Sequence, residues 1–325
     1  MSFENIFQEG LLVRLHIKQW SGQVQLSPED LDIDSQAVEH PKYKFILGKK
    51  YLIPKEETDV IRAIELRGRR VITGSSFVFP IGDLPFVPAN LITEVIAGLD
   101  TVKGEFFVAV EDLCARYQAI AHESLRSYTG VAKKIWEVGR KSQAEREFEN
   151  SFVARIRTAF PGPKKLRSKY AFDYSIFSIS APGNQGSTAE LIDTAVAKQC
   201  RKELEAQTRQ FLEDVVQELR QRTVDTFTEV SSKIAKGQIV SEATMNTLRT
   251  FIDGYERLNF IGDKGISKTL ADFRSQWLNQ DAKGIREASA LKDEFAQALD
   301  QVAQRASDLT DVSKITGRIK RKLDL

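Results

Sequence analysis

The feature that most constrains the fold is an apolar pattern with helical spacing that continues for about fifty residues after Pro88. Its apolar positions are Leu91, Val95, Leu99, Val102, Phe106, Ala109, Leu113, Ile120, Leu125, Val131, Ile135 and Val138. A recurrence every three or four residues is typical of one face of an amphipathic helix. The pattern predicts one long helix, either straight or bent near Gly130.

The same periodicity predicts further helices on both sides of this one. The expected segments are 56–67, 142–159, 188–236, 241–260, 267–277 and 284–309. Ser27 and Pro28 open a shorter helix, Ser187 or Thr188 caps the second long one, and the Arg67–Arg70 run favours a helix end. Two long helices on either side of a central excursion predict an antiparallel hairpin, as in a coiled coil.

Alternating patterns predict a small sheet. In residues 11–20, apolar and basic side chains alternate and so lie on opposite sides of an extended chain. In residues 171–180, apolar and polar side chains alternate in the same way. Residues 71–87 form either one or two short strands or an apolar loop, and Pro80 and Pro85 argue against a central strand there. The sheet is expected to contain residues 11–20, 71–79 and 171–180.

These elements predict an α+β fold that is predominantly α, with a long antiparallel helical bundle or coiled-coil hairpin and a small β-sheet. We expect a small α/β region at 1–87 and a long helical hairpin at 88–236, with a strand and loop excursion at 160–187. Helices of 237–325 are expected to pack on the bundle. No internal repeat is found.

Composition limits the function classes. The 47 Lys and Arg nearly balance 45 Asp and Glu, so a charged partner must be recognised locally. Cys114 and Cys200 lie far apart and are predicted to be buried, inert thiols in a reducing compartment. No targeting signal or membrane-spanning run is apparent, so we expect a soluble cytoplasmic protein with no membrane partner.

Motifs for nucleotide or metal chemistry fail on spacing. The segment 262–269 resembles a phosphate loop, but its glycines are wrongly spaced, so a turn between helices is expected. His16, His40 and His122 do not have zinc-ligand spacing. Asp30, Asp32 and Asp34 resemble the start of a calcium loop, but Ser35 and Pro41 replace its required Gly and Glu. A capped, acidic helix start accounts for these acids better.

The sequence therefore predicts no catalytic, cofactor-binding or metal-binding residue. No hydrolase elbow, kinase signature or dinucleotide fingerprint appears. A pair of carboxylates that converge only in the folded chain stays open, and with it an unrecognised hydrolase. A non-enzymatic protein is the expectation.

Three basic clusters remain, at Lys42–Lys55, Lys164–Lys169 and Arg318–Lys322. They either contact the phosphates of nucleic acid or pair with acids of the same fold. Tyr170 and Phe172 adjoin the second cluster and are placed to stack on bases. The candidate nucleic-acid-binding residues are Lys164, Lys165, Arg167, Lys169, Arg318, Lys320, Arg321 and Lys322.

The N-terminal region resembles a known family. The pattern Leu-x-Val-x-Leu-x-Ile-x-x-Trp20-Ser21-Gly22, followed by Leu26-Ser27-Pro28-Glu29-Asp30-Leu31, is similar to an uncharacterised bacterial and phage family, one of the numbered domains of unknown function. The stretch from Gly74 to Pro80 and the helix with Leu99 and Phe106 extend the likeness over roughly the first 130 residues. Members tend to be encoded beside MoxR-type AAA+ ATPases and von Willebrand factor A proteins. The resemblance identifies no catalytic residue.

The resemblance implies an accessory role in an ATPase-driven remodelling system of phage or mobile-element origin. The expected function is a non-enzymatic adaptor or structural subunit of a cytosolic assembly, accessory to a MoxR-type AAA+ ATPase. The alternative is a nucleic-acid-binding protein that uses the local basic clusters. The sequence does not indicate the oligomeric state.

Overall fold

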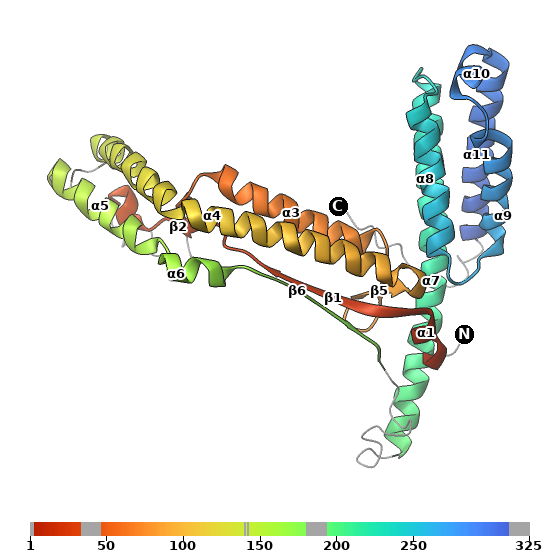
Figure 1. The fold of residues 1–325 in the computed structure, drawn as a ribbon, viewed down its shortest axis with the longest axis horizontal. Helices are drawn as coiled ribbons and strands as arrows, with labels where there is room; N and C mark the ends of the chain where they lie inside the picture. Colours follow the sequence, from red (N-terminus) through yellow and green to blue (C-terminus); the bar gives the residue numbers. More distant parts are fainter. Residues whose placement is uncertain (1–2, 34–46, 140, 142, 180–193, 312–325) are drawn as a thin grey trace. The chain divides into compact units, whose positions relative to one another are not determined.

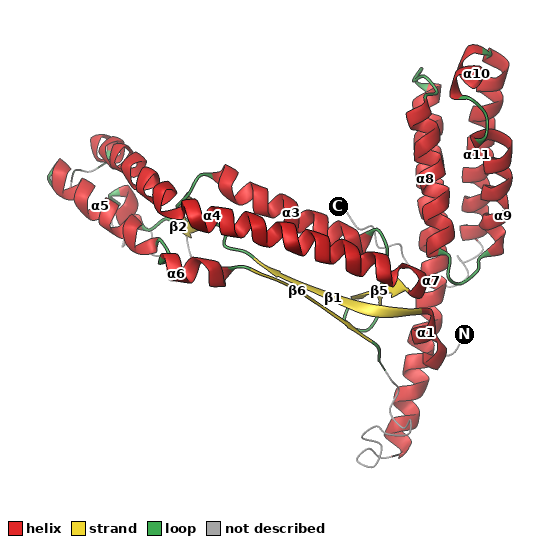
Figure 2. Ribbon diagram, viewed as in Figure 1, coloured by secondary structure: helices red, strands yellow, loops and turns green. Residues whose placement is uncertain are grey.

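The computed structural model describes residues 3–33, 47–139, 141, 143–179 and 194–311. Helices dominate these residues and a small antiparallel sheet accompanies them (Figure 2), as the α+β, predominantly α prediction requires. None of the described helices combines the length and the apolar character needed to cross a bilayer.

Contacts group the chain into two compact units made of interleaved segments. Unit 1 consists of Met1–Val13, Ser75–Thr93 and Ile176–Leu325, and unit 2 consists of Arg14–Gly74 and Glu94–Ser175. Local sequence patterns do not predict this grouping, because it depends on which distant segments pack together. The expected pairing of the two long helices stays a prediction, since almost all of the first lies in unit 2 and the second lies in unit 1.

The main sheet has the strand order β4-β5-β1-β6. Its strands are β1 (Gly10–Lys18), β4 (Phe77–Phe79), β5 (Leu84–Pro88) and β6 (Ala171–Phe177). β5 is antiparallel to β1 and β4. The predicted alternation is confirmed in β1 and β6, where polar side chains are exposed and apolar ones are more buried. A separate antiparallel pair joins β2 (Gln23–Gln25) to β3 (Lys49–Tyr51).

The prediction that Pro85 excludes a central strand is wrong. β5 contains Pro85 and lies between β4 and β1. Its register with β1 covers only Phe86–Pro88, whereas Pro85 faces Val78 of β4. Pro85 therefore faces only β4 and Pro88 faces only β1, so each proline lies where β5 is paired on one side alone, as at the edge of a sheet.

Unit 2 contains the long helix that the sequence predicts. This helix, α4, is continuous over Ala89–Val138, with its first turn in unit 1. The other helical elements of unit 2 are η1 (Pro28–Leu31), α3 (Lys55–Thr73), α5 (Glu145–Ala159), α6 (Pro163–Leu166) and η2 (Arg167–Lys169). Figure 1 shows α3 alongside α4, and ion pairs join the two helices. α5 packs on α4 through Phe148, Phe152 and Ala132.

The helix α3 does not end at Arg67–Arg70, as its Gly and cations had indicated, but continues to Thr73. Gly68 is buried inside it, and a Cβ at this position would lie 3.0 Å from the Phe172 ring of β6. The absent side chain thus admits a strand residue to the helix surface. The glycine serves close packing and not helix termination.

Unit 1 is built around α7 (Thr194–Ala235), along which α11 (Ser289–Asp311) packs. The remaining helices of the unit are α1 (Phe3–Glu9), α8 (Glu242–Leu258), α9 (Lys264–Phe273), the π-helical turn η4 (Arg274–Leu278) and α10 (Ala282–Glu287). The helix expected at 284–309 is two helices, because Ala288 adopts an extended conformation between them. The start of the second long helix, at residues 187–188, lies outside the described residues.

Aromatic rings join the strands of unit 1 to its helices. Phe211 of α7 makes edge contacts with Phe79 and Phe86, at ring-centroid distances of 4.9 and 5.2 Å. Phe86 also lies 5.5 Å from Phe260, which follows α8. Such pairs add specific geometry to the burial of apolar area, so this cluster fixes β4 and β5 on α7.

Candidate functional site

The candidate site is the segment from Arg157 to Lys169, here called the basic segment. It contains the end of α5, the α6 turn and η2, all in unit 2. Pro161 and Pro163 separate α5 from α6, and Pro163 occupies the first turn of α6, where its missing N–H costs nothing. No Asp or Glu occurs from Asn150 to Phe172, so neighbours along the chain do not neutralise these cations.

Arg167 is engaged within the fold. Its guanidinium Nε donates to Glu111 of α4, and the group lies 4.6 Å from the centroid of the Phe107 ring. This geometry combines an ion pair with a cation–π contact. Of the two interpretations of the cluster, internal pairing therefore holds for Arg167.

Lys164 and Lys165 are exposed and Lys169 is half-buried. Within the described part of the chain, none of the three forms an ion pair or a side-chain hydrogen bond. Arg157 is likewise exposed and without an ion pair among those residues. The sequence prediction omitted Arg157, although the acid-free run of residues 150–172 could have identified it. These four cations are available to a polyanion.

The predicted base-stacking role of the neighbouring aromatics is wrong. Tyr170 is 4% exposed and packs on Phe106, while Phe172 is fully buried against Gly68. Burial raises the pKa of the Tyr170 hydroxyl, as expected for a phenol enclosed by protein. Both rings belong to the core of unit 2.

The other predicted cations have different positions. Arg318, Lys320, Arg321 and Lys322 lie outside the described residues, as does the first part of the Lys42–Lys55 cluster. Within that cluster, Lys50 pairs with buried Asp30, and Lys55 pairs with Asp59 on the surface of α3.

Asp30 is the centre of a buried polar cluster in unit 2. Its side chain is 1% exposed and accepts hydrogen bonds from the Ser27 N–H at 2.9 Å and from Lys50. Arg155 of α5 lies 3.4 Å from its other oxygen. Burial alone would raise the pKa of Asp30, but these hydrogen bonds and the Lys50 charge hold it below its usual value. The acid thus serves a capped helix start and an ion pair, and its calcium-loop resemblance is accounted for.

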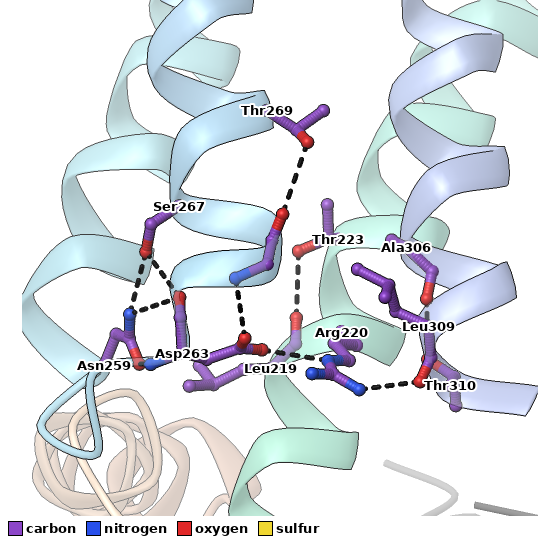
Figure 3. A network of polar contacts seen from close by, with 11 residues as sticks. Leu219, Arg220, Thr223, Asn259, Asp263, Ser267, Thr269, Ala306, Leu309 and Thr310 are labelled. Atoms are coloured by element: carbon purple, nitrogen blue, oxygen red, sulfur yellow. Dashed lines mark hydrogen bonds and ion pairs between the residues drawn. The ribbon is translucent and has the colours of Figure 1, made fainter. Parts of the chain in front are cut away.

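A second polar cluster ties together the helices of unit 1 (Figure 3). Arg220 of α7 donates to Asp263 at 2.9 Å and to the carbonyl of Leu309 at 2.6 Å. Asp263 caps α9 by accepting from the Gly265 N–H at 3.0 Å, and the Asn259 side chain accepts from the Asp263 N–H. The segment 262–269 is therefore the predicted turn between two helices.

Neither of the described cysteines is fully buried, in contrast to the prediction. Cys114 and Cys200 are both half-buried. Burial and the nearby Glu111 raise the pKa of the Cys114 thiol, which disfavours the nucleophilic thiolate at neutral pH. The expected inertness of this thiol stays consistent with its surroundings.

The described residues offer a hollow of about 180 Å³ between α7 and α8. Its charged lining residues, Glu229 and Lys233, bond to each other one turn apart on α7. The hydrogen bond from Lys233 lowers the pKa of Glu229. Across the residues with described positions, no group of three His, Cys, Asp or Glu side chains is placed to hold a metal ion.

Comparison with known proteins gives a family but no characterised relative. The model of the family described as "Protein of unknown function (DUF3150)" matches residues 7–284. Neither a curated protein nor a solved structure matches the chain. The match includes the N-terminal signature and extends through most of the helices of both units. The chain therefore belongs to the DUF3150 family of proteins of unknown function.

Proposed function

We propose that this protein is a non-enzymatic adaptor or structural subunit that holds partners in a cytosolic assembly. The observation that carries the proposal is the way charged side chains brace unit 2. Ion pairs attach α4 to its neighbours on separate elements: Arg116–Glu57 and Arg67–Glu105 to α3, Lys103–Asp173 to β6 and Arg167–Glu111 to η2.

A braced helix suits an adaptor because binding to it orders few additional groups. Association costs free energy for every side chain or loop that it immobilises, so a surface fixed in advance binds more tightly for the same contacts. The bidentate Arg116–Glu57 pair, with both distances at 2.8 Å, has the geometry that best fixes two elements. Gly68 and Phe172 add close contact between α3 and β6.

The proposed partner is a MoxR-type AAA+ ATPase. This partner comes from the family resemblance, and the braced unit supplies the surface that such an assembly needs. The full chain, tagged and expressed in its own cells, should copurify with an AAA+ ATPase at high salt, as mass spectrometry would show. High salt removes weak electrostatic association and leaves contacts with a buried apolar centre.

A matched pair of variants tests the role of the brace. Arg116→Ala with Glu57→Ala removes the α3–α4 clamp, whereas Lys233→Ala with Glu229→Ala removes an exposed pair on α7. ATPase recovery should fall for the first pair and stay constant for the second. Failure to recover any ATPase after cross-linking intact cells would refute the adaptor proposal for this partner.

Nucleic-acid binding is a second candidate, favoured by the free cations of the basic segment. Phosphate contacts release counterions, so affinity should fall steeply with salt. In a gel shift, Lys164→Glu, Lys165→Glu and Lys169→Glu together should abolish binding. Arg62→Glu, Lys133→Glu and Lys134→Glu make the same charge change elsewhere on unit 2, outside the three basic clusters, and should retain most of it. Equal losses in both variants would assign the binding to overall charge alone.

A further inference from the structure

We infer that the basic segment contacts the sugar-phosphate backbone of duplex nucleic acid, without selecting base sequence or single strands. The inference rests on the second function proposed above and names its ligand class. Three observations carry it: the packing of the aromatic rings in and around the segment, its lack of apolar anchors and its number of free cations.

The aromatic rings around the segment are already in use. Proteins that hold single strands stack bases on exposed aromatic faces, which contributes about 1–3 kcal/mol per base. Here Tyr170 and Phe172 are buried, Arg167 covers Phe107, and the Phe160 ring packs 6.3 Å from that of Tyr117. Phe107 and Phe160 are half-buried, so none of these rings is exposed. The surface therefore offers no row of exposed rings on which successive bases of a single strand could stack.

The segment also lacks the anchors of a protein interface. The large apolar side chains exposed in the described chain are Tyr51, Val60, Leu66, Val78, Val108, Val131, Val138, Val196 and Ile239. None of them belongs to residues 157–169. Protein interfaces are built on buried aromatic, aliphatic or Arg anchors and are depleted in Lys. Three of the four free cations here are lysines, which suit point contacts with phosphates.

The number of free cations sets the expected salt dependence. Arg157, Lys164, Lys165 and Lys169 can neutralise at most four phosphates, since Arg167 is paired with Glu111. Each neutralised phosphate of B-DNA contributes about −0.9 to the slope of log K against log salt concentration. The slope for the basic segment should therefore be no steeper than about −3.6, the value for four engaged cations.

The test measures fluorescence anisotropy of labelled DNA with the full-length protein over a salt series. The probes are two duplexes of unrelated sequence and a single strand of the same length. We expect equal affinity for both duplexes, no tighter binding of the single strand, and a slope of about −3.6 for the duplexes. Replacement of the four cations by Gln should remove most of that slope. Gln at Arg62, Lys133, Lys134 and Lys233 is the matched control, and circular dichroism should show that both variants keep their helices.

The outcomes separate the inference from the function on which it rests. If no DNA binds at low salt, the proposed nucleic-acid function fails, and the inference fails with it. If DNA binds but the Gln variant keeps the slope, or the single strand binds more tightly, only the inference is overturned. Displacement by poly-glutamate as effective as that by unlabelled duplex, at equal charge concentration, would assign the segment to acidic proteins instead.

Discussion

The two units solve the same local problem with opposite arrangements. In each unit, a carboxylate at a helical turn accepts hydrogen bonds from a nearby backbone N–H and from a cationic side chain distant in sequence. This carboxylate is Asp30 in unit 2 and Asp263 in unit 1. In unit 2 the acid is the centre, because Asp30 collects Lys50 and Arg155 from two elements. In unit 1 the cation is the centre, because Arg220 joins Asp263 to the Leu309 carbonyl.

This difference determines the residue whose removal should destabilise each unit most. Asp30 is 1% exposed, while Lys50 and Arg155 are 11% and 35% exposed. Removing Asp30 leaves Lys50 without its acceptor and leaves Arg155 with only its hydrogen bond to the Glu29 carbonyl. Arg220 is 19% exposed and Asp263 is 7% exposed, so removing Arg220 leaves a nearly buried carboxylate that keeps its cap to Gly265. Unit 2 should therefore be more sensitive at its acid and unit 1 at its base.

The largest effect is expected for Asp30→Ala. Breaking a buried ion pair on one side costs about 3–5 kcal/mol, so unit 2 should lose about that much free energy of unfolding. Urea unfolding followed by tryptophan fluorescence measures it in a Trp277→Phe background, where Trp20 and Trp136 of unit 2 are the reporters. Asp59→Ala removes an exposed pair of the same unit and should cost no more than about 0.5 kcal/mol. Equal decreases in the free energy of unfolding for Asp30→Ala and Asp59→Ala would show that the Asp30 cluster does not stabilise unit 2 more than an exposed ion pair does.

Arg220→Met should destabilise unit 1 by a smaller amount, about 2–3 kcal/mol, because Asp263 keeps its bond to the Gly265 N–H. Trp277 reports unit 1 when Trp20 and Trp136 are replaced by Phe. Lys233→Met on the same helix, which breaks only an exposed pair, is the control. If Arg220→Met lowered the free energy of unfolding of unit 1 by less than the control does, Arg220 would not hold this cluster together.

The pH dependence sharpens the contrast in unit 2. The folded-state pKa of Asp30 is lowered, so the stability it contributes is present above its unfolded pKa of about 4 and is lost as pH falls through the folded value. The difference in unfolding free energy between the wild type and Asp30→Ala should stay constant from about pH 8 to pH 5. Below about pH 4 it should narrow progressively, because protonation of Asp30 removes the stability that its lowered pKa contributes. Urea unfolding at a series of pH values measures it, and a gap that widens in acid would contradict the assigned pairing.

The smallest effect concerns the packing of unit 2 and uses two glycines. Gly104 in α4 has open space around its missing Cβ, so Gly104→Ala should stabilise unit 2 by up to about 1 kcal/mol through helix propensity. Gly68→Ala gains the same propensity but drives a methyl group to 3.0 Å from the Phe172 ring. We expect Gly68→Ala to be destabilising by about 1 kcal/mol. Thermal unfolding of both variants decides the sign, and two stabilising substitutions would mean that α3 and β6 are loosely packed.

Local signals predicted the elements that local chemistry determines. The periodicity from Leu91 to Val138 gave α4, the alternation of residues 13–18 gave β1, and Ser241 caps α8 as expected. The end of α3 was missed because the reason for Gly68 is a ring more than a hundred residues away. Pro85 was misjudged because its tolerance depends on the strand register.

The candidate site was predictable only as a composition. The composition of residues 164–169 predicts a cationic surface. Lys164, Lys165 and Lys169 have no ion-pair partner among the described residues, so their charges can contact a ligand. Arg167 is paired because Glu111 lies beside it in the fold. Tyr170 and Phe172 are buried because they pack against Phe106 and Gly68. Such partners lie far away in sequence, and only the packed chain brings them into contact.

The interleaved segments of the two units set an order of assembly during synthesis. Unit 2 has all its residues once Ser175 has been made, so it can fold while translation continues. Met1–Val13 and Ser75–Thr93 are synthesised much earlier than α7, whose Phe211 covers Phe79 and Phe86. The strands β4 and β5 therefore lack their final helix until α7 has been synthesised. During this interval the nascent chain exposes apolar strand residues that could pair with other chains.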